Sequence, residues 1–229
     1  MSAFSAFEAK IGHTFRDERL LQTAFTHRSY LNENRTSGRE HNERLEFLGD
    51  AVLELAVTDF LFRKYPDKPE GELTMYRAAL VNTVSISDAA QKLGMNDFLL
   101  LSRGEARDTG RARAIILANA FEAVIGALYL DGGYEAAHAF VAAQLFSKTD
   151  EVVEKRLWQD AKSRFQELAQ ERVGVTPGYQ LLHHVGPDHA RTFTVGVFLA
   201  AERVAVGEGK SKQEAEQQAA EKALEVKGW

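Results

Sequence analysis

The segment spanning residues 42–66 constrains the fold more than any other part of the chain. After Asp50 it is largely apolar and meets no helix breaker before Pro66, which predicts one long helix. At about 100° per residue, Glu43, Glu46 and Asp50 lie within a sector roughly 60° wide on that helix. The opposite side carries the residues that we expect to face a core, namely Leu45, Leu48, Val52 and Leu55.

The acidic stripe on this helix has two interpretations. Many amphipathic helices have a solvated acidic face, whereas like charges this close together also suit a bound cation. Phe47 projects on the acidic side, which indicates contact with another surface. Gly49 lies inside the helix, where it costs about 1 kcal/mol relative to Ala, so it indicates a close approach of another backbone. The stripe by itself leaves both interpretations open.

Composition narrows the class of protein only moderately. The chain has 229 residues, enough for one large domain or two modest ones. It has no cysteine, which excludes disulfides, thiolate metal sites and cysteine nucleophiles. The net charge of −5 argues mildly against a nucleic-acid partner, although a small basic patch would suffice to contact phosphates. We find neither a secretory signal nor a membrane-spanning window, and so expect a cytoplasmic protein without a membrane partner.

The periodicity of the chain changes near residue 150. Residues 7–141 have helical patterns, and residues 148–156 are charged and poor in large apolar side chains. The remainder alternates a helix, three extended segments and a final helix. We therefore predict an all-α domain over residues 1–150, a linker over residues 151–158, and a small α+β domain of order α-β-β-β-α over residues 159–229.

A second acidic position occurs on the helix predicted near residues 113–130. Asn119 and Glu122 are three residues apart and share a face, while the neighbouring Gly126 permits another helix to approach. If this face meets the face of Glu46 and Asp50, four oxygen-bearing side chains surround one point. Carboxylate and amide oxygens are the ligands that a hard divalent cation prefers.

The last predicted helix begins at a short basic segment. Lys210 and Lys212 flank Ser211, where free main-chain N–H groups and the helix dipole favour an anion. Ordinary solvation of two lysines is the alternative.

These stretches together resemble the ribonuclease III family. The motif Asn42–Asp50 is similar to the family signature, Leu117–Asp131 to its second acidic motif, and Asp160–Leu224 to a double-stranded RNA-binding domain. The resemblance implies a homodimeric, Mg²⁺-dependent endoribonuclease, with Mn²⁺ as a substitute and no organic cofactor. It would hydrolyse double-stranded RNA in rRNA and other precursors, leaving 5′-phosphate and 3′-hydroxyl ends with short 3′ overhangs.

The resemblance also implies roles for individual residues. Asp50 and Glu122 fall on the catalytic acids, and Glu46 and Asn119 on the remaining metal ligands. Glu43 and Glu70 fall on secondary acidic positions, and Phe47 on an aromatic that contacts the partner subunit. The residues expected to bind RNA are Ser163, Gln166, Gln170, His189, Lys210, Ser211 and Lys212.

Position 119 departs from the family pattern, because Asp is usual there and this chain has Asn. The substitution removes one negative charge but leaves a carbonyl oxygen that can coordinate Mg²⁺. The chain is therefore expected to bind Mg²⁺ more weakly than a version with Asp. An alternative is a catalytically impaired dimer that binds double-stranded RNA without cutting it. A third interpretation, a helical protein with merely solvated acids, predicts neither activity.

Overall fold

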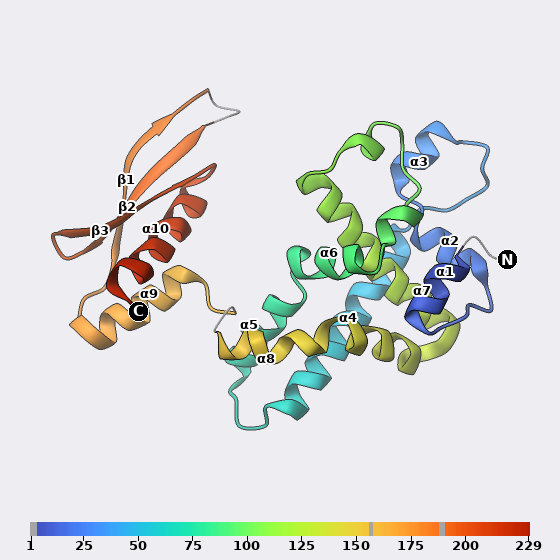
Figure 1. The fold of residues 1–229 in the computed structure, drawn as a ribbon, viewed down its shortest axis with the longest axis horizontal. Helices are drawn as coiled ribbons and strands as arrows, with labels where there is room; N and C mark the ends of the chain where they lie inside the picture. Colours follow the sequence, from blue (N-terminus) through green and yellow to red (C-terminus); the bar gives the residue numbers. More distant parts are fainter. Residues whose placement is uncertain (1–3, 156–157, 188–190) are drawn as a thin grey trace. The chain divides into compact units, whose positions relative to one another are not determined.

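A computed structural model describes residues 4–155, 158–187 and 191–229 (Figure 1). The chain divides into two compact units, Met1–Trp158 and Gln159–Trp229. The first unit is helical and the second combines helices with one antiparallel sheet, so the predicted fold class is confirmed.

The described part of the first unit consists of α-helices joined by turns and longer loops. The α-helices are α1 (Ser5–Ile11), α2 (Glu18–Ala24), α3 (Arg28–Glu33), α4 (Glu43–Lys64), α5 (Glu70–Leu80), α6 (Thr83–Lys92), α7 (Arg111–Leu145) and α8 (Thr149–Glu154). Three 3₁₀ turns are η1 (Met95–Phe98), η2 (Glu105–Arg107) and η3 (Phe146–Lys148). Helix α4 is the long helix predicted from the sequence, and α4 and α7 pack against each other through the unit's core (Figure 1).

Two glycines allow α4 and α7 to touch backbone to backbone. A Cβ atom added to Gly49 would lie 1.7 Å from the carbonyl oxygen of Glu122. A Cβ atom added to Gly126 would lie 2.3 Å from the carbonyl oxygen of Leu45. Since no side chain fits at either position, the close approach predicted from Gly49 and Gly126 is confirmed.

The buried face of α4 includes fewer of the predicted apolar residues than the sequence suggests. Leu45 and Val52 are buried, and Leu48 packs against the core, as predicted. Leu55 was expected there too, but its side chain is 57% exposed. The expectation for Leu55 was wrong because the helices around α4 cover only part of its apolar side.

Helix α7 is the most apolar segment of the chain. The helical stretch Arg111–Glu154 contains an 18-residue window with a mean hydropathy of 1.6, which is enough to cross a membrane by length and composition. The expectation that no window approaches such a composition was therefore wrong. Of that window, 67% is buried inside the protein, which accounts for its apolar character as that of a central core helix. The helix bends at Gly133, where φ is 77°.

Asp131, just before that bend, ties α7 to the loop between α1 and α2. Its side chain is buried and accepts hydrogen bonds from the backbone N–H groups of Arg16 and Asp17, at 3.0 and 3.1 Å. His13 Nε2 lies 3.0 Å from the second carboxylate oxygen. Burial opposes ionisation, but the hydrogen bonds from Asp17, His13 and Arg16 outweigh it and hold the pKa of Asp131 below its usual value.

We expect Asp131→Asn to destabilise the first unit by about 1 to 3 kcal/mol at pH 7, because buried donors lose a charged acceptor. A lowered pKa stabilises the folded state above the unfolded value of about 3.9, and that contribution is lost as the pH falls through the folded pKa. The difference in the free energy of unfolding between Asp131→Asn and the wild type should therefore be constant near neutral pH and shrink below about pH 4. Urea unfolding of both proteins across this pH range measures the difference. Asp67→Asn, at an exposed position, is the matched control.

The segment expected to be a linker belongs partly to the first unit. Residues 151–154 lie in α8, and Val152, Val153 and Trp158 pack against the unit's core. The Trp158 ring meets the ring of Tyr76 edge to face, with centroids 5.2 Å apart. The helical unit thus extends beyond residue 150, because these apolar side chains find a surface that the local sequence does not reveal.

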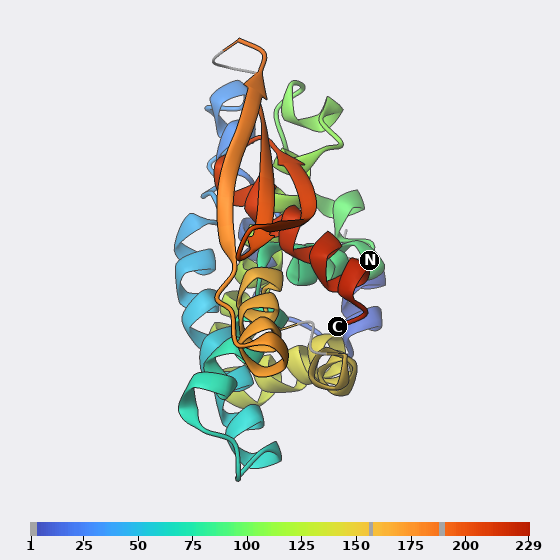
Figure 2. The ribbon, with the colours of Figure 1, turned by 90° about the vertical axis from the view of Figure 1, so that its left-hand side faces the viewer.

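The second unit is a three-stranded antiparallel sheet with two helices on one face (Figure 2). Its elements are α9 (Ala161–Val173), β1 (Gly178–Val185), β2 (Thr192–Leu199), β3 (Glu202–Gly209) and α10 (Lys212–Lys227). The strand order is β1-β2-β3, so each strand pairs with its neighbour in sequence. Phe165 of α9, Val197 of β2 and Ala219 of α10 are fully buried in a shared core.

Candidate active site and RNA-binding surface

The contact between α4 and α7 brings the two predicted acidic faces together. Gly49 lies between Glu46 and Asp50 and touches the backbone of Glu122, so the side chains at positions 46 and 50 face those at 119 and 122. Asp50 is exposed, whereas Glu46, Asn119 and Glu122 are half-buried. Asn119 also hydrogen-bonds to the Glu46 side chain, which opposes the rise in the Glu46 pKa.

We call Glu46, Asp50, Asn119 and Glu122 the acid cluster, and its three carboxylates lie close enough to repel one another. Burial, together with the negative charges of Asp50, Glu46 and Glu54, raises the pKa of Glu122 to about 7. Burial and the charges of Glu43 and Asp50 raise the pKa of Glu46 as well. A positive ion would relieve both effects.

The donor set of the acid cluster suits a hard divalent cation such as Mg²⁺. Three carboxylates and one amide carbonyl supply only oxygen ligands, and their repulsion leaves negative charge to be neutralised. Within residues 4–155, 158–187 and 191–229, no three His, Asp or Glu side chains converge closely enough to form a ready metal cage. The residues therefore fit the ion by chemistry and charge, without a preformed coordination shell.

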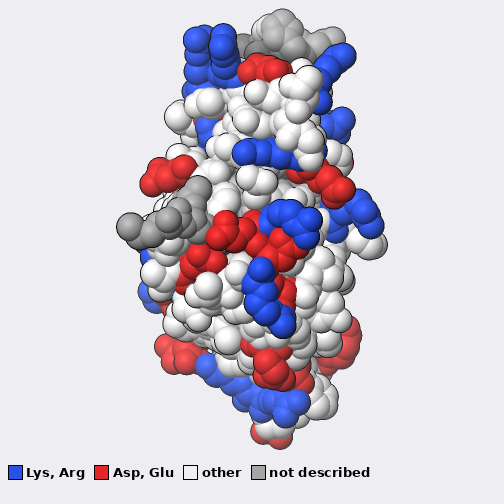
Figure 3. Space-filling view, turned by 90° about the vertical axis from the view of Figure 1, so that its right-hand side faces the viewer, with Lys and Arg blue, Asp and Glu red and all other residues white. Residues whose placement is uncertain are grey.

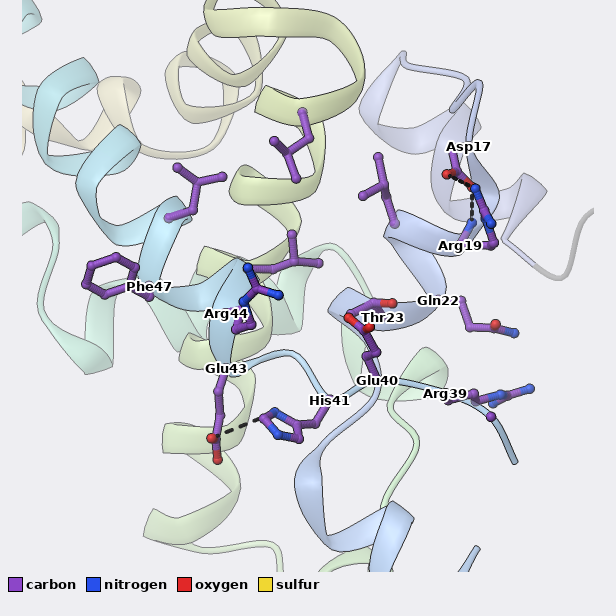
Figure 4. Close-up of a pocket in the computed structure, with 15 residues that line it drawn as sticks. Asp17, Arg19, Gln22, Thr23, Arg39, Glu40, His41, Glu43, Arg44 and Phe47 are labelled. Carbon is purple, nitrogen blue, oxygen red and sulfur yellow. Dashed lines mark hydrogen bonds and ion pairs between the residues drawn. The ribbon is translucent and has the colours of Figure 1, made fainter. Parts of the chain in front are cut away.

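Glu43 is held by basic neighbours beside the acid cluster. Arg28 Nη1 lies 3.2 Å from one carboxylate oxygen. His41 Nδ1 lies 3.7 Å from the other oxygen (Figure 4). Its charge still contributes to the raised pKa of Glu46. The structure thus places Glu43 at the edge of the cluster, with its own ion pairs.

Glu70 lies apart from the acid cluster. It is the first residue of α5 and accepts a hydrogen bond of 2.9 Å from the Thr74 hydroxyl. It lines a separate pocket of about 370 Å³ together with Thr58 and Phe62 of α4. These two residues are eight and twelve positions beyond Asp50, about 12 to 18 Å along the helix. Within one subunit, the structure does not bring Glu70 together with the other predicted acids.

Phe47 stands beside an open pocket at the start of α4. Its side chain is 83% exposed and points away from the core, as the sequence predicted. The neighbouring pocket has a volume of about 890 Å³ (Figure 4). Its apolar lining comes from Leu20, Leu45, Leu48 and Leu130, with polar groups such as Arg44 and Gln22 around them.

The second unit displays the predicted polar residues on α9. Ser163, Gln166 and Gln170 are all exposed and line one shallow hollow of about 570 Å³ along that helix. Their spacing of three and four residues places them on one face. Glu167 and Glu171 border the same hollow.

The start of α10 is basic but already hydrogen-bonded. Lys210 and Lys212 are exposed, and the Ser211 hydroxyl caps the helix by accepting a hydrogen bond of 3.1 Å from the Glu214 N–H. The Glu214 carboxylate accepts a hydrogen bond of 2.8 Å from the Lys210 N–H. An intramolecular carboxylate thus occupies one donor that a phosphate could use. His189 lies outside the described residues.

Basic and acidic side chains intermix on the protein face shown in Figure 3. This distribution agrees with a net charge of −5.

Comparisons with known proteins identify both units. A family model described as Ribonuclease-III-like matches residues 17–149, and the double-stranded RNA binding motif matches residues 161–227. The proteins named Ribonuclease 3 from Pelotomaculum thermopropionicum and Bacillus cereus are 48% and 49% identical to this chain. These matches cover 94% and 97% of this chain, and 89% and 90% of the relatives.

Solved structures agree with the assignment of the first unit. Two solved structures of the nuclease domain of ribonuclease III from Campylobacter jejuni are 39% and 38% identical to this chain, with TM-scores of 0.56 and 0.58. They cover 62% and 65% of this chain, and each is covered over 97% of its own length. A helical nuclease domain followed by a double-stranded RNA-binding domain defines an endoribonuclease that acts on double-stranded RNA. The chain belongs to the ribonuclease III family, and the resemblance inferred from its motifs is confirmed.

Proposed function

We propose that this chain is a homodimeric, Mg²⁺-dependent endoribonuclease that processes rRNA and other precursors in the cytoplasm, leaving 5′-phosphate and 3′-hydroxyl ends with short 3′ overhangs. The observation that carries the metal dependence is the acid cluster. Burial and the neighbouring carboxylates raise the pKa of Glu122 and of Glu46, and an anionic phosphodiester could not approach them unless a cation changed the local potential. Mn²⁺ would satisfy the same oxygen donors.

In this proposal each residue of the acid cluster has a distinct task. Asp50 and Glu122 are the essential carboxylates, Glu46 supplies a third, and Asn119 supplies a neutral carbonyl oxygen. When bound, Mg²⁺ neutralises the phosphodiester and lowers the pKa of the attacking water. The partial burial of Glu122 and the packing of α4 on α7 keep the carboxylates oriented before RNA arrives. Because water can act as the nucleophile, none is required from the protein.

The decisive experiment incubates end-labelled, long duplex RNA with the protein, with and without Mg²⁺, and analyses the termini of the fragments. We expect scission only with Mg²⁺ or Mn²⁺, with 5′-phosphate ends. Intact duplex under both conditions would contradict the proposed enzyme and favour a dimer that only binds RNA. That second candidate is supported by Asn119, whose neutral side chain lowers the negative charge of the acid cluster.

Asn119→Asp is expected to lower the Mg²⁺ concentration needed for half-maximal cleavage. The change adds a negative charge and a second carboxylate oxygen beside Glu46 and Glu122, and both strengthen binding of a divalent cation. At an effective dielectric constant near that of water, one extra charge at the site should lower this concentration by about tenfold. Cleavage rates measured across a series of Mg²⁺ concentrations test this. Superimposable curves would contradict the weaker affinity proposed for Asn119.

Exposed apolar side chains along α4 support the homodimer. Phe47, Leu55 and Phe62 are 83%, 57% and 69% exposed, and their spacing places them within one sector of the helix. The pocket beside Phe47 is apolar and open, so a two-fold axis could place each Phe47 in the partner's pocket. Such a dimer would present two acid clusters, one for each RNA strand.

Phe47→Ala is expected to weaken the dimer by at least about 30-fold, because an exposed aromatic anchor at an interface contributes about 2 kcal/mol or more. The folding stability of the subunit should change little, since Phe47 contributes almost nothing to the core. Sedimentation equilibrium over a range of concentrations measures the dissociation constant. Val226→Ala, at another exposed apolar position, serves as the control, and an unaltered dimer in Phe47→Ala would remove Phe47 from the interface.

The second unit would dock the duplex through its polar face. In this proposal Ser163, Gln166 and Gln170 would contact 2′-hydroxyl groups in a minor groove, and Lys210 and Lys212 would contact phosphates. By resemblance, His189 and its loop would reach the next minor groove, and Ser211 would support the lysines. Such domains recognise the shape of A-form RNA over about 16 base pairs, which suits a nuclease of broad sequence range.

A further inference from the structure

Glu54 is an acid beside the acid cluster for which sequence analysis found no role. It lies four residues after Asp50 on α4, so the two side chains share one side of the helix. Its negative charge contributes to the electrostatic environment of Glu122. Glu54 is therefore close enough to the cluster to alter its potential.

Arg77 of α5 balances the charge of Glu54. The Arg77 Nε atom lies 2.7 Å from a Glu54 carboxylate oxygen, and Nη1 donates a hydrogen bond of 2.9 Å to the Thr58 hydroxyl. The Arg77 side chain is 33% exposed and that of Glu54 is 38% exposed, so both are only partly shielded from water. A guanidinium remains charged at any physiological pH, and its fork is held here by two contacts with α4.

We propose that the Arg77–Glu54 pair sets the net charge next to the acid cluster and so balances its affinity for a divalent cation against its repulsion of RNA phosphates. With both partners present the pair is neutral. Without Arg77, Glu54 would add a full negative charge, which attracts a cation and repels a phosphodiester. Without Glu54, Arg77 would add a positive charge with the opposite consequences. Arg77 is a positioning residue, because it acts through Glu54.

This inference rests on the proposed metal site, and binding of Mn²⁺ in the absence of RNA tests it separately from activity. Electron paramagnetic resonance of free Mn²⁺ gives the dissociation constant for the full-length protein. We expect Arg77→Gln to tighten Mn²⁺ binding and Glu54→Gln to weaken it, each by about threefold to tenfold for a unit charge roughly 10 Å from the ion. The double variant should bind nearly as the wild type does, and so should Arg77→Lys, which keeps the charge.

For binding of duplex RNA without divalent cations, the two single variants should have effects on affinity opposite to their effects on Mn²⁺ binding. Arg77→Gln is expected to weaken RNA binding, and Glu54→Gln to strengthen it. The matched control is the ion pair of Asp59 and Arg63, joined at 2.9 Å. It lies farther along α4, with Asp59 nine residues and about 14 Å beyond Asp50. Asp59→Asn and Arg63→Gln make the same charge changes farther from the acid cluster, where water and salt screen the charge over a longer path, so neither should move the Mn²⁺ dissociation constant.

A merely structural role for the pair would lower the melting temperature of both single variants without opposite changes in Mn²⁺ affinity. Suppose that the wild type binds Mn²⁺ but the dissociation constants of Arg77→Gln and Glu54→Gln shift equally in one direction, or do not shift. That result would overturn the inference and leave the proposed metal site intact. A wild-type protein that fails to bind Mn²⁺ would overturn both. If Arg77→Gln does not fold, Glu54→Gln still tests the sign, since tighter binding or no change there contradicts the proposal.

Discussion

Glu122→Gln is expected to lower the rate of duplex RNA cleavage by at least about 10³-fold, the upper range for removing one preorganised electrostatic group. The substitution is nearly isosteric, but it replaces with a neutral amide a carboxylate that feels the charges of three neighbouring acids. The acid cluster then loses negative charge and one strong oxygen ligand. Asp50→Asn should have the same consequence, because its carboxylate faces Glu122 across the contact of α4 with α7.

Binding of RNA should survive in the Glu122→Gln variant, since the second unit carries its own RNA-binding surface. A single-turnover cleavage assay and a gel-shift assay on the same duplex separate the two properties. Glu135→Gln, at an exposed position of the same helix, is the matched control and should cut at the wild-type rate. Retention of more than a tenth of the wild-type rate in Glu122→Gln would remove this residue from the proposed catalytic pair.

Gly49→Ala is expected to destabilise the first unit by at least about 3 kcal/mol, although Ala is the better helix former by about 1 kcal/mol. The added methyl group would lie 1.7 Å from the Glu122 carbonyl oxygen and 2.9 Å from the Gly126 nitrogen. Both neighbours are backbone atoms, so α4 and α7 can relieve the clash only by moving apart. That movement separates Glu46 and Asp50 from Glu122, and cleavage should fall together with stability.

Urea unfolding followed by circular dichroism measures the loss of stability in Gly49→Ala. Gly71→Ala is a sharp control, because Gly71 also lies in a helix but a Cβ atom there would meet no atom within 4 Å. It should be neutral or stabilising by up to about 1 kcal/mol. Equal stability of the two variants would show that α4 and α7 can shift apart without cost.

Local periodicity predicted much of the fold. The long helix with its acidic stripe, the apolar helix carrying Asn119 and Glu122, and the three strands after residue 178 were all predicted close to their observed positions. These features depend on the spacing of side chains along one segment, which the sequence displays directly. Gly49 and Gly126 also indicated a close contact, because a glycine inside a helix has a cost that packing must offset.

Features that depend on contacts between distant segments were harder to predict from the sequence. Leu55 has the spacing of a core residue, but no neighbouring helix covers it. Trp158 is the last residue of the predicted linker, yet its ring packs against Tyr76. The ion pair of Arg77 and Glu54 joins two different helices, and no sequence motif predicts it.

The amino-acid sequence by itself determined which elements form and which oxygen donors each presents, because both follow from local periodicity and residue type. Only the tertiary structure decided which faces meet. The backbone contact at Gly49 sets Glu46 and Asp50 against Asn119 and Glu122, and leaves Glu70 beside another pocket. Helix pairing depends on how whole surfaces fit together, and the raised pKa of Glu122 arises only after that fit has buried it among other acids.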